Sequence, residues 1–330
     1  MPAPAVRGQD AAKLAARLQA ADAASALDAS DVKPWHLKMD VQLFDAKGKP
    51  TDQGTIEEWW SSPEMDRREY KTAAYTATEI RSGSKLYRTS GLDLPPYHLE
   101  LLRWQVVHPI PPERGKAASF IPELRKLNAG KPSLDCIFLR SSSAQAPAVL
   151  GATPTYCMKA DSDSLLMSLD FGSQEIVRGS IGRFQGKEVA VDAVVTVDNI
   201  KAATEHVESL VAEAAPESEF AVSVDTPEVV PAIVASGDPV TLDTLGSAVS
   251  QAQPVYPAQA KQEYLAGRVV LRAIIATDGS VRSIQVISSS NSIFETSAIG
   301  AVRQWKYKPS TMNGQPTEVE TVIVLNFSFG

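Results

Sequence analysis

The sequence predicts an α+β protein with an N-terminal curved antiparallel half-barrel carrying packed helices, followed by a small C-terminal α+β domain. Three observations lead to this fold class. Many short segments alternate apolar and polar residues with a period of two, as half-buried strands do. Helical spacing is confined to a few stretches between these segments. An acidic, proline-bearing stretch then separates the two parts.

The N-terminal part reads as helix, meander, helix and meander. Alanine-rich residues 9–28, with leucines at helical spacing, predict a first helix. The period changes at residues 35–43, which place apolar side chains on one face of a strand, and further strand segments follow to about residue 90. Residues 97–108 predict a helix that ends before Pro109 and lies across the sheet. Strand segments resume at Leu134 and continue to about residue 210, so we expect one long curved sheet around an apolar core.

Composition shifts define the expected domain boundaries. Residues 211–252 contain seven acidic residues, four prolines and no lysine or arginine, which is typical of an extended linker, although its apolar pieces could pack on a domain. We therefore predict a half-barrel domain at 1–210, a linker at 211–252 and a terminal domain at 253–330.

The terminal domain is expected to contain a hairpin, a helix and a last strand. Gly267 precedes an alternating strand, and Asp278-Gly279 supplies the positive φ angles of a tight turn. Ser292 with Glu295 predicts a capping box for a helix that runs to Trp305. Every one of these residues has a structural explanation, so the functional prediction depends on the last strand.

The final strand is a candidate edge strand because it lies at the end of the chain. An edge strand exposes unpaired N–H and C=O groups, and an extended peptide can bind by pairing with them as an additional strand. The residues predicted to bind a partner in this way are Thr321, Val322, Ile323, Val324, Leu325, Asn326 and Phe327.

Several spaced motifs over about the last eighty residues carry a family resemblance. They are P-x-Y-P-x-x-A from Pro254 to Ala260, then Gly267, the Asp278-Gly279 turn, and a helix leading into Arg303, Trp305, Tyr307 and Pro309. In this order they resemble the TonB C-terminal domain.

This resemblance implies strand addition of the N-terminal peptide of an outer-membrane, TonB-dependent transporter. It also implies transporter contacts by the entry segment, which carries over to Gln253, Pro254, Tyr256 and Pro257. The alternative, equally weighted, is that these residues only pack the entry onto the domain. Domains of this type can exchange strands between copies, which would give a dimer. The chain departs from a full energy transducer, since neither a membrane anchor nor a long spacer is visible in its sequence.

The N-terminal order of elements resembles the half-barrel of the lipoprotein carriers LolA and LolB. That resemblance implies a concave apolar surface for a lipid, a lipopeptide or a hydrophobic peptide. A ligand there would meet Trp35, Trp59, Trp60 and Trp104 first, although tryptophans more often belong to a core.

Charge and cysteine content narrow the class of protein. With 32 basic and 39 acidic residues the formal net charge is -7, which argues against nucleic acid as a partner. No apolar run is long enough to span a bilayer, and the N-terminus lacks a signal peptide, so the protein is cytosolic or its targeting segment is absent from this chain. Cys136 and Cys157 lie in strand-like segments, which favours a disulfide in an oxidising compartment over two unrelated thiols. We therefore expect a periplasmic or cell-envelope location.

Catalytic and metal-binding constellations are not expected. The four histidines, at 36, 98, 108 and 206, have no i, i+4 partner and no neighbouring cysteine in sequence, so we predict no metal site and no cofactor. The sequence thus favours a non-enzymatic envelope protein that binds a partner peptide through its terminal domain. The alternative is a carrier that binds a lipid or lipopeptide in the half-barrel.

Overall fold

The computed structural model describes residues 4–111, 120–127, 133–141, 154–170, 173–229, 233–234, 247–312 and 314–328. The chain divides into two compact units. Unit 1 comprises Met1–Ser84 with Leu99–Val224, and unit 2 comprises Lys85–His98 with Asp225–Gly330. The mixed α+β class is confirmed, whereas the predicted domain boundaries stay a prediction. The assignment of Lys85–His98 to unit 2 had no counterpart in the sequence analysis.

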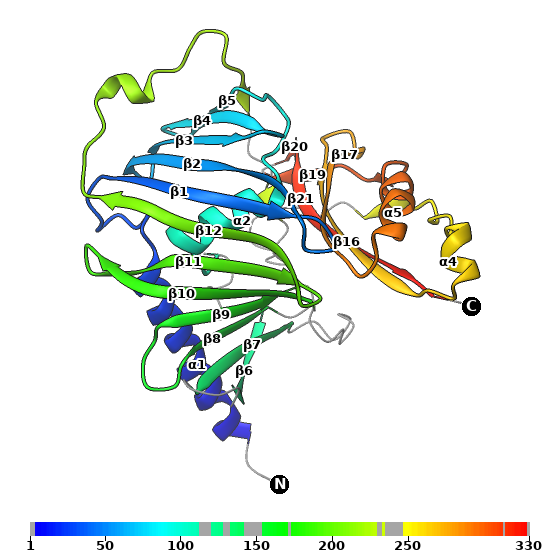
Figure 1. Cartoon of the computed structure of the whole chain (residues 1–330), viewed down its shortest axis with the longest axis horizontal. Helices are drawn as coiled ribbons and strands as arrows, with labels where there is room; N and C mark the ends of the chain where they lie inside the picture. The colour runs from blue at the N-terminus through cyan, green and yellow to red at the C-terminus, as the bar shows by residue number, and fades with distance from the viewer. Residues whose placement is uncertain are drawn as a thin grey trace. The chain divides into compact units, whose positions relative to one another are not determined.

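Unit 1 contains a large curved antiparallel sheet in the order β4-β3-β2-β1-β12-β11-β10-β9-β8-β7-β6 (Figure 1). Consecutive strands pair throughout, and β1 with β12 joins the early meander to the late one. The strands are β1 (Trp35–Phe44), β2 (Pro50–Ser62), β3 (Met65–Thr72), β4 (Thr76–Ser82), β6 (Phe120–Leu127), β7 (Leu134–Ser141), β8 (Thr155–Lys159), β9 (Leu165–Asp170), β10 (Gln174–Phe184), β11 (Lys187–Val197) and β12 (Ile200–Val211).

The period-two pattern of β1 explains its central place in this sheet. Trp35, Leu37, Met39 and Val41 are all buried, and they form one apolar core with residues from both neighbouring sides of the sheet. Alternating side chains point to opposite faces of a strand, so a single sequence pattern fixes which face of the sheet is apolar. The predicted inward face of this strand is confirmed.

Two helices cover parts of the apolar face of the sheet. Helix α1 (Pro4–Ser25) packs Leu18 and Ala21 against side chains of β7, β8 and β9. Helix α2 (Tyr97–Val107) contributes Leu99, Leu102, Val106 and Val107 to the core over β1 and β2. It ends before Pro109 as predicted, because proline disfavours helical geometry at the residue that precedes it.

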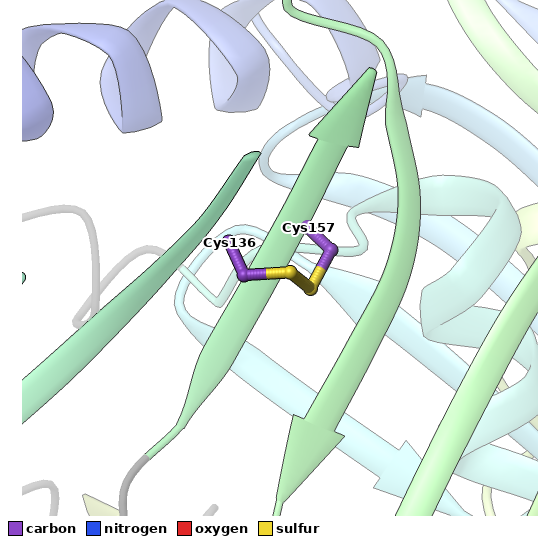
Figure 2. Close-up of a disulfide and its surroundings, with 2 residues drawn as sticks. All are labelled: Cys136 and Cys157. Carbon is purple, nitrogen blue, oxygen red and sulfur yellow. A yellow bond between two sulfur atoms is a disulfide. The ribbon is translucent and has the colours of Figure 1, made fainter. Parts of the chain in front are cut away.

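A disulfide joins two neighbouring strands of unit 1. Cys136 on β7 lies directly opposite Cys157 on β8, and their sulfur atoms are bonded (Figure 2). The predicted pairing is confirmed. The two cysteines are 21 residues apart in sequence. A closed loop of that size restricts the unfolded chain enough to stabilise the fold by about 3 kcal/mol.

Unit 2 is built around a four-stranded sheet in the order β14-β21-β16-β17. Helix α5 (Glu295–Val302) packs on its apolar face through Ala298 and Val302, and Phe294, directly before the helix, is buried in the same core with residues of β16 and β21. The elements are β5 (Lys85–Arg88), β13 (Glu228–Val229), β14 (Ile233–Val234), β15 (Ala248–Ser250), α4 (Ala258–Gln262), β16 (Gly267–Ile275), β17 (Val281–Ser289), β18 (Lys306–Tyr307), β19 (Ser310–Met312), β20 (Gln315–Thr317) and β21 (Val319–Phe327).

The predicted hairpin is confirmed, and its turn has an additional function. Gly279 has a φ of +78°, and its carbonyl accepts a hydrogen bond of 2.9 Å from the backbone N–H of Tyr307. A Cβ atom at this position would collide with the backbone of Tyr307. Glycine is therefore required both by the turn and by the close approach of the chain that follows α5.

The predicted capping box is wrong. A short 3-10 turn (Ser292–Phe294) precedes α5, and the side chain of Asn291 accepts a hydrogen bond of 3.0 Å from the backbone N–H of Ile293. Helix α5 itself begins at Glu295 with no side-chain cap at Phe294. Asparagine is as good a cap as serine, and the observed capping residue is Asn291, one residue before the predicted Ser292.

The described parts of residues 211–252 are paired to unit 2 in three places. β13 pairs with β5, β15 pairs with β18, and β14 pairs with the start of β21. A 3-10 turn (Glu217–Phe220) precedes them. The acidic stretch therefore supplies short strands, as its apolar pieces suggested, and its role as a linker stays a prediction.

Candidate functional site

Strand β21 is paired along its whole length on one flank and only at its start on the other. On the first flank β16 pairs antiparallel with every residue from Val319 to Phe327. On the second flank β14 pairs parallel with Val319 and Glu320. Within the described part of the chain, no strand pairs with the second flank from Thr321 to Phe327. These seven residues coincide with the predicted edge, and the backbone groups on that flank are free to pair.

The side chains of β21 alternate between the core and the solvent. Ile323, Leu325 and Phe327 are buried under α5. On the opposite face Val322 is 40% exposed and Val324 is 45% exposed. Two exposed valines beside an unpaired backbone give an added strand apolar surface as well as hydrogen bonds.

Two ion pairs hold the start of β21. The guanidinium of Arg272 on β16 bonds to both carboxylate oxygens of Glu320 at 2.8 and 2.9 Å. Arg282 on β17 likewise bonds to both oxygens of Glu318. Bidentate pairs of this kind are strong and directional. They fix the beginning of β21, so its free flank is part of a rigid sheet.

Segment Leu92–Pro95 lies against β17 on the far side of this sheet from β21. The amide of Gln285 donates to the carbonyls of Leu94 and Pro95 at 3.3 and 3.2 Å, and Arg282 donates to the carbonyl of Leu92 at 3.4 Å. These side-chain contacts fix Leu92–Pro95 to β17, which forms the other edge of the four-stranded sheet.

The entry segment meets β21 at its C-terminal end. The ring of Tyr256 contacts Phe294 and Phe327 edge-on, with ring centres 5.7 and 5.9 Å apart. Its hydroxyl also donates to the carbonyl of Leu265. These contacts give Tyr256 a structural role in packing. They also bring the entry segment next to β21, so the two predicted binding segments are in contact.

The other entry residues are placed less deeply. Gln253 is exposed, and Pro254 and Pro257 are half-buried. The indole N–H of Trp305 donates to the carbonyl of Ala252 at 2.9 Å, which fixes the chain immediately before Gln253. The transporter-contacting role of Gln253, Pro254, Tyr256 and Pro257 stays a prediction.

The four tryptophans proposed to line a ligand cavity are not brought together. Trp35 and Trp60 are buried and stacked, with ring centres 5.8 Å apart. Trp59 stacks on His36 on the opposite face of the sheet, because neighbouring residues of a strand alternate. Trp104 lies partly exposed on α2. A ligand-contacting role therefore stays a prediction for the set, and the structure groups only Trp35 with Trp60.

Buried charges in unit 1 are functional candidates that the sequence analysis missed. Glu58 is fully buried, and both of its carboxylate oxygens accept from Arg103 on α2 at 2.6 and 2.5 Å. Arg68 extends this network to Asp66 at 2.9 Å and to Glu79 at 3.2 Å. The sequence did contain a signal for the burial of Glu58, because it lies midway between Ile56 and Trp60, on the inward face of the alternating strand.

A second buried pair lies on β10 and β12. Arg178 is 3% exposed and Glu205 is 4% exposed. Burial is the main cause that raises the pKa of Glu205 to about 9, with the charge of Asp192 adding to the shift and Arg178 opposing it. The parity of Glu205, two residues after the buried Ala203, would have placed it on the inward face.

Among the described residues, His36, His108 and His206 each bond to carboxylates of their own, and Nε2 of His98 is buried without a hydrogen-bond partner. His108 lies between Asp28, 2.6 Å from Nδ1, and Asp22, 2.9 Å from Nε2. Burial lowers its pKa, but the hydrogen bonds to Asp22 and Asp28 outweigh this effect and raise the pKa to about 9. Burial alone lowers the pKa of His98 to about 4. In the described ranges, no group of three or more histidine, cysteine, aspartate or glutamate side chains is arranged so that it could hold a metal ion.

None of the described helices is both long enough and apolar enough to cross a lipid bilayer. This finding agrees with the absence of a long apolar run in the sequence.

Residues 252–329 match the family model described as Gram-negative bacterial TonB protein C-terminal. The same region is 35% identical over 80 residues to the protein TonB of Escherichia coli (strain K12), covering 24% of this chain and 34% of that protein. It is 28% identical over 93 residues to the protein TonB of Vibrio cholerae serotype O1, covering 28% and 38%. The chain thus spans about a third of the length of the curated relatives it matches. The resemblance of the C-terminal part to this family is confirmed.

Two solved structures are similar to separate parts of the chain. A LolA superfamily protein from Nitrosomonas europaea matches with a TM-score of 0.41 and 8% identity, over 62% of this chain and 97% of that one. The TonB C-terminal domain of Pseudomonas aeruginosa matches with a TM-score of 0.24 and 26% identity, over 26% and 86%.

Proposed function

We propose that unit 2 captures an extended peptide as an additional strand on the free flank of β21, and that the peptide belongs to an outer-membrane transporter. One observation supports this function above the others: among the described residues, no strand pairs with the outer flank of β21 from Thr321 to Phe327, beside two exposed valines. The family match of residues 252–329 supports the choice of partner and a location in the periplasm or cell envelope. The protein acts by binding and not by catalysis.

Strand β14 supports the orientation of the captured peptide. It pairs with β21 in parallel at Val319 and Glu320, so this flank already accepts a parallel strand. A peptide that pairs beyond β14 would continue the same line along Thr321–Phe327 and satisfy the remaining donors and acceptors.

Calorimetric titration of the full chain with a synthetic N-terminal peptide of such a transporter tests this function. We expect saturable binding that is lost in Ile323→Pro or Val324→Pro, because proline removes a backbone donor. The N–H groups of two successive residues point to opposite flanks, so one of the two variants removes a free donor and the other a donor to β16.

Each proline variant is accepted only if its circular dichroism matches that of the wild type. A milder change, Val324→Lys, removes the exposed apolar surface, and its matched control is Val249→Lys, at an exposed valine on β15. Capture that persists in folded Ile323→Pro and folded Val324→Pro would rule out this strand as the docking edge.

A second function is carriage of a hydrophobic ligand by unit 1. The observation that favours it is the pair of buried charged groups on the apolar face of the sheet, described in detail below. Native mass spectrometry of the purified full chain tests it: a co-purifying lipid supports carriage, and a chain that binds no added amphiphile refutes it.

A further inference from the structure

Two charged residues and one alanine lie in register on three neighbouring strands of unit 1. Arg178 on β10 is paired in register with Ala193 on β11, and Ala193 is paired with Glu205 on β12. Paired residues on neighbouring strands point to the same face, and strands are about 4.8 Å apart, so the two long side chains start about 10 Å from each other. Between them Ala193 contributes only a methyl group.

The two charged side chains do not satisfy each other. Nη1 of Arg178 donates to the carbonyl of Leu165 on β9 at 3.0 Å, which turns the guanidinium away from β12. In the part of the chain that the structure describes, Nε and Nη2 of Arg178 and both carboxylate oxygens of Glu205 are buried and find no hydrogen-bond partner. A buried charge without a partner costs several kcal/mol, and a buried polar group without a hydrogen bond also costs free energy, so a fold that keeps both indicates a use for them.

Apolar side chains lie next to the pair on the same face, and the charges of Glu188 and Asp192 also act on it. Ile176 lies two residues before Arg178, Ala203 two residues before Glu205, and Val195 two residues after Ala193, and all three belong to the main core of unit 1. A group that reaches the pair must therefore carry its polar atoms on an otherwise apolar molecule.

The charges of Arg178 and Glu205 determine whether an anion or a cation fits between them. Burial lowers the pKa of Arg178 to about 10, with the charges of Glu205 and Glu188 opposing this shift, so its guanidinium is protonated at neutral pH. The carboxyl group of Glu205, with its pKa raised to about 9 chiefly by burial, is protonated at neutral pH and can donate a hydrogen bond. The line then offers one positive charge and donors from both ends, which fits an oxyanion and disfavours a cation.

We propose that Arg178 and Glu205 bind the anionic head group, a carboxylate or a phosphate, of an amphiphile whose apolar part contacts the hydrophobic face of the same sheet. This proposal rests on the second function above, carriage by unit 1, and is independent of peptide capture by unit 2. Because both side chains are almost fully buried, the ligand enters during an opening motion, and association is slow relative to diffusion.

Binding of four probes to the delipidated full chain tests the proposal. The probes are oleate, oleoyl lysophosphatidic acid, oleyl alcohol and inorganic phosphate, each followed by calorimetry. We expect either anionic amphiphile to bind at least about tenfold more tightly than oleyl alcohol, since a desolvated charge-assisted hydrogen bond contributes this much or more. The ratio between oleate and lysophosphatidic acid distinguishes a carboxylate ligand from a phosphate ligand, and phosphate alone should bind weakly because it lacks the apolar part.

Three variants locate the binding to this line of residues. Arg178→Met should remove the preference for the anionic probes, and Ala193→Leu should weaken all three amphiphiles because it fills the space between the charges. Arg183→Met, on the same strand with an exposed side chain, is the matched control and should leave the preference unchanged.

Each outcome decides between the proposals. Equal affinity of the wild type for oleate and oleyl alcohol would overturn the oxyanion site while leaving carriage intact. No binding of any amphiphile would overturn both. Because the comparison of probes is made on the wild type, it decides the question even if a variant fails to fold.

Discussion

The two sets of buried charges in unit 1 lie on the apolar face of one sheet and differ in how their carboxylates are bonded. Among the described residues, both oxygens of Glu58 accept from Arg103, whose Nη1 alone is buried without a partner, whereas both oxygens of Glu205 and two nitrogens of Arg178 have none. Buried ionic groups that satisfy each other hold a fold in one arrangement, and those that do not are held by the fold at a cost. We infer that the first set stabilises the fold, and the second is the set that we propose binds a ligand.

Strand β21 shows the same contrast within one element. Its flank towards β16 is fully paired and fixes the strand, while on its other flank no strand of the described ranges pairs beyond β14. In both units, polar groups with partners explain the architecture, and polar groups without partners mark the places where we propose binding.

The largest effect is expected from breaking the satisfied set. Arg103→Met should lower the free energy of unfolding by about 3 to 5 kcal/mol, because it leaves the fully buried carboxylate of Glu58 with only the more distant Arg68. Urea denaturation of the wild type and the variant measures this change. The double variant Glu58→Leu with Arg103→Met should recover much of the loss, and a single variant within 1 kcal/mol of wild type would contradict a structural role.

A change in the opposite direction is expected for the unsatisfied set. The pKa of Glu205 in the folded protein, about 9, is higher than its usual value of 4.5, so its contribution to stability is full below pH 4.5 and is lost as pH rises towards 9. Glu205→Gln should therefore stabilise the protein by about 1 to 3 kcal/mol at pH 8 and have little effect near pH 4.5. Thermal melts across this range measure the difference, and a variant less stable than wild type at pH 8 would show that the ionised carboxylate is satisfied.

His108 provides a satisfied titrating group against which Glu205 is compared. Its pKa in the folded protein, about 9, exceeds the usual 6.5, so the stabilisation by Asp22 and Asp28 is full below pH 6.5 and is lost as pH rises through 9. His108→Gln should destabilise the protein by about 1 to 2 kcal/mol at pH 6 and much less at pH 9.5. Equal destabilisation at both pH values would mean that the imidazole is neutral in the folded protein.

The smallest effect on stability is expected at the open flank of β21. Val322→Lys should change the free energy of unfolding by no more than about 0.5 kcal/mol, because the side chain is already 40% exposed. It should nevertheless weaken peptide capture, measured by the calorimetric titration described above. A large loss of stability would show that this valine is covered in solution.

Much of the fold could be predicted from the sequence because it is determined by patterns within short segments of the chain. Alternation in Trp35–Leu43 fixed the inward face of β1, and Asp278-Gly279 fixed the hairpin. The cap at Asn291 was missed because Ser292 offered an equivalent local signal. The position of β14 could not be predicted, since a two-residue strand has no period and is defined only by its distant partner.

The candidate site was predictable only in part for a similar reason. The residues of β21 and the cysteine pair lie on strands whose pattern is visible in sequence. Which buried charges find partners depends on contacts between segments far apart in sequence, such as Glu58 with Arg103, and no local pattern records them. Parity along the strand identified the inward face, but it could not show that Arg178 turns towards Leu165 instead of Glu205.

Hydrogen exchange along β21 of the full chain tests the central claim most directly. Without peptide, alternate amides from Thr321 to Phe327 should exchange rapidly while their neighbours, which donate to β16, are protected, and addition of the transporter peptide should protect both sets. Uniform protection of these amides in the protein alone, unchanged by peptide, would contradict an open flank and with it the proposed capture.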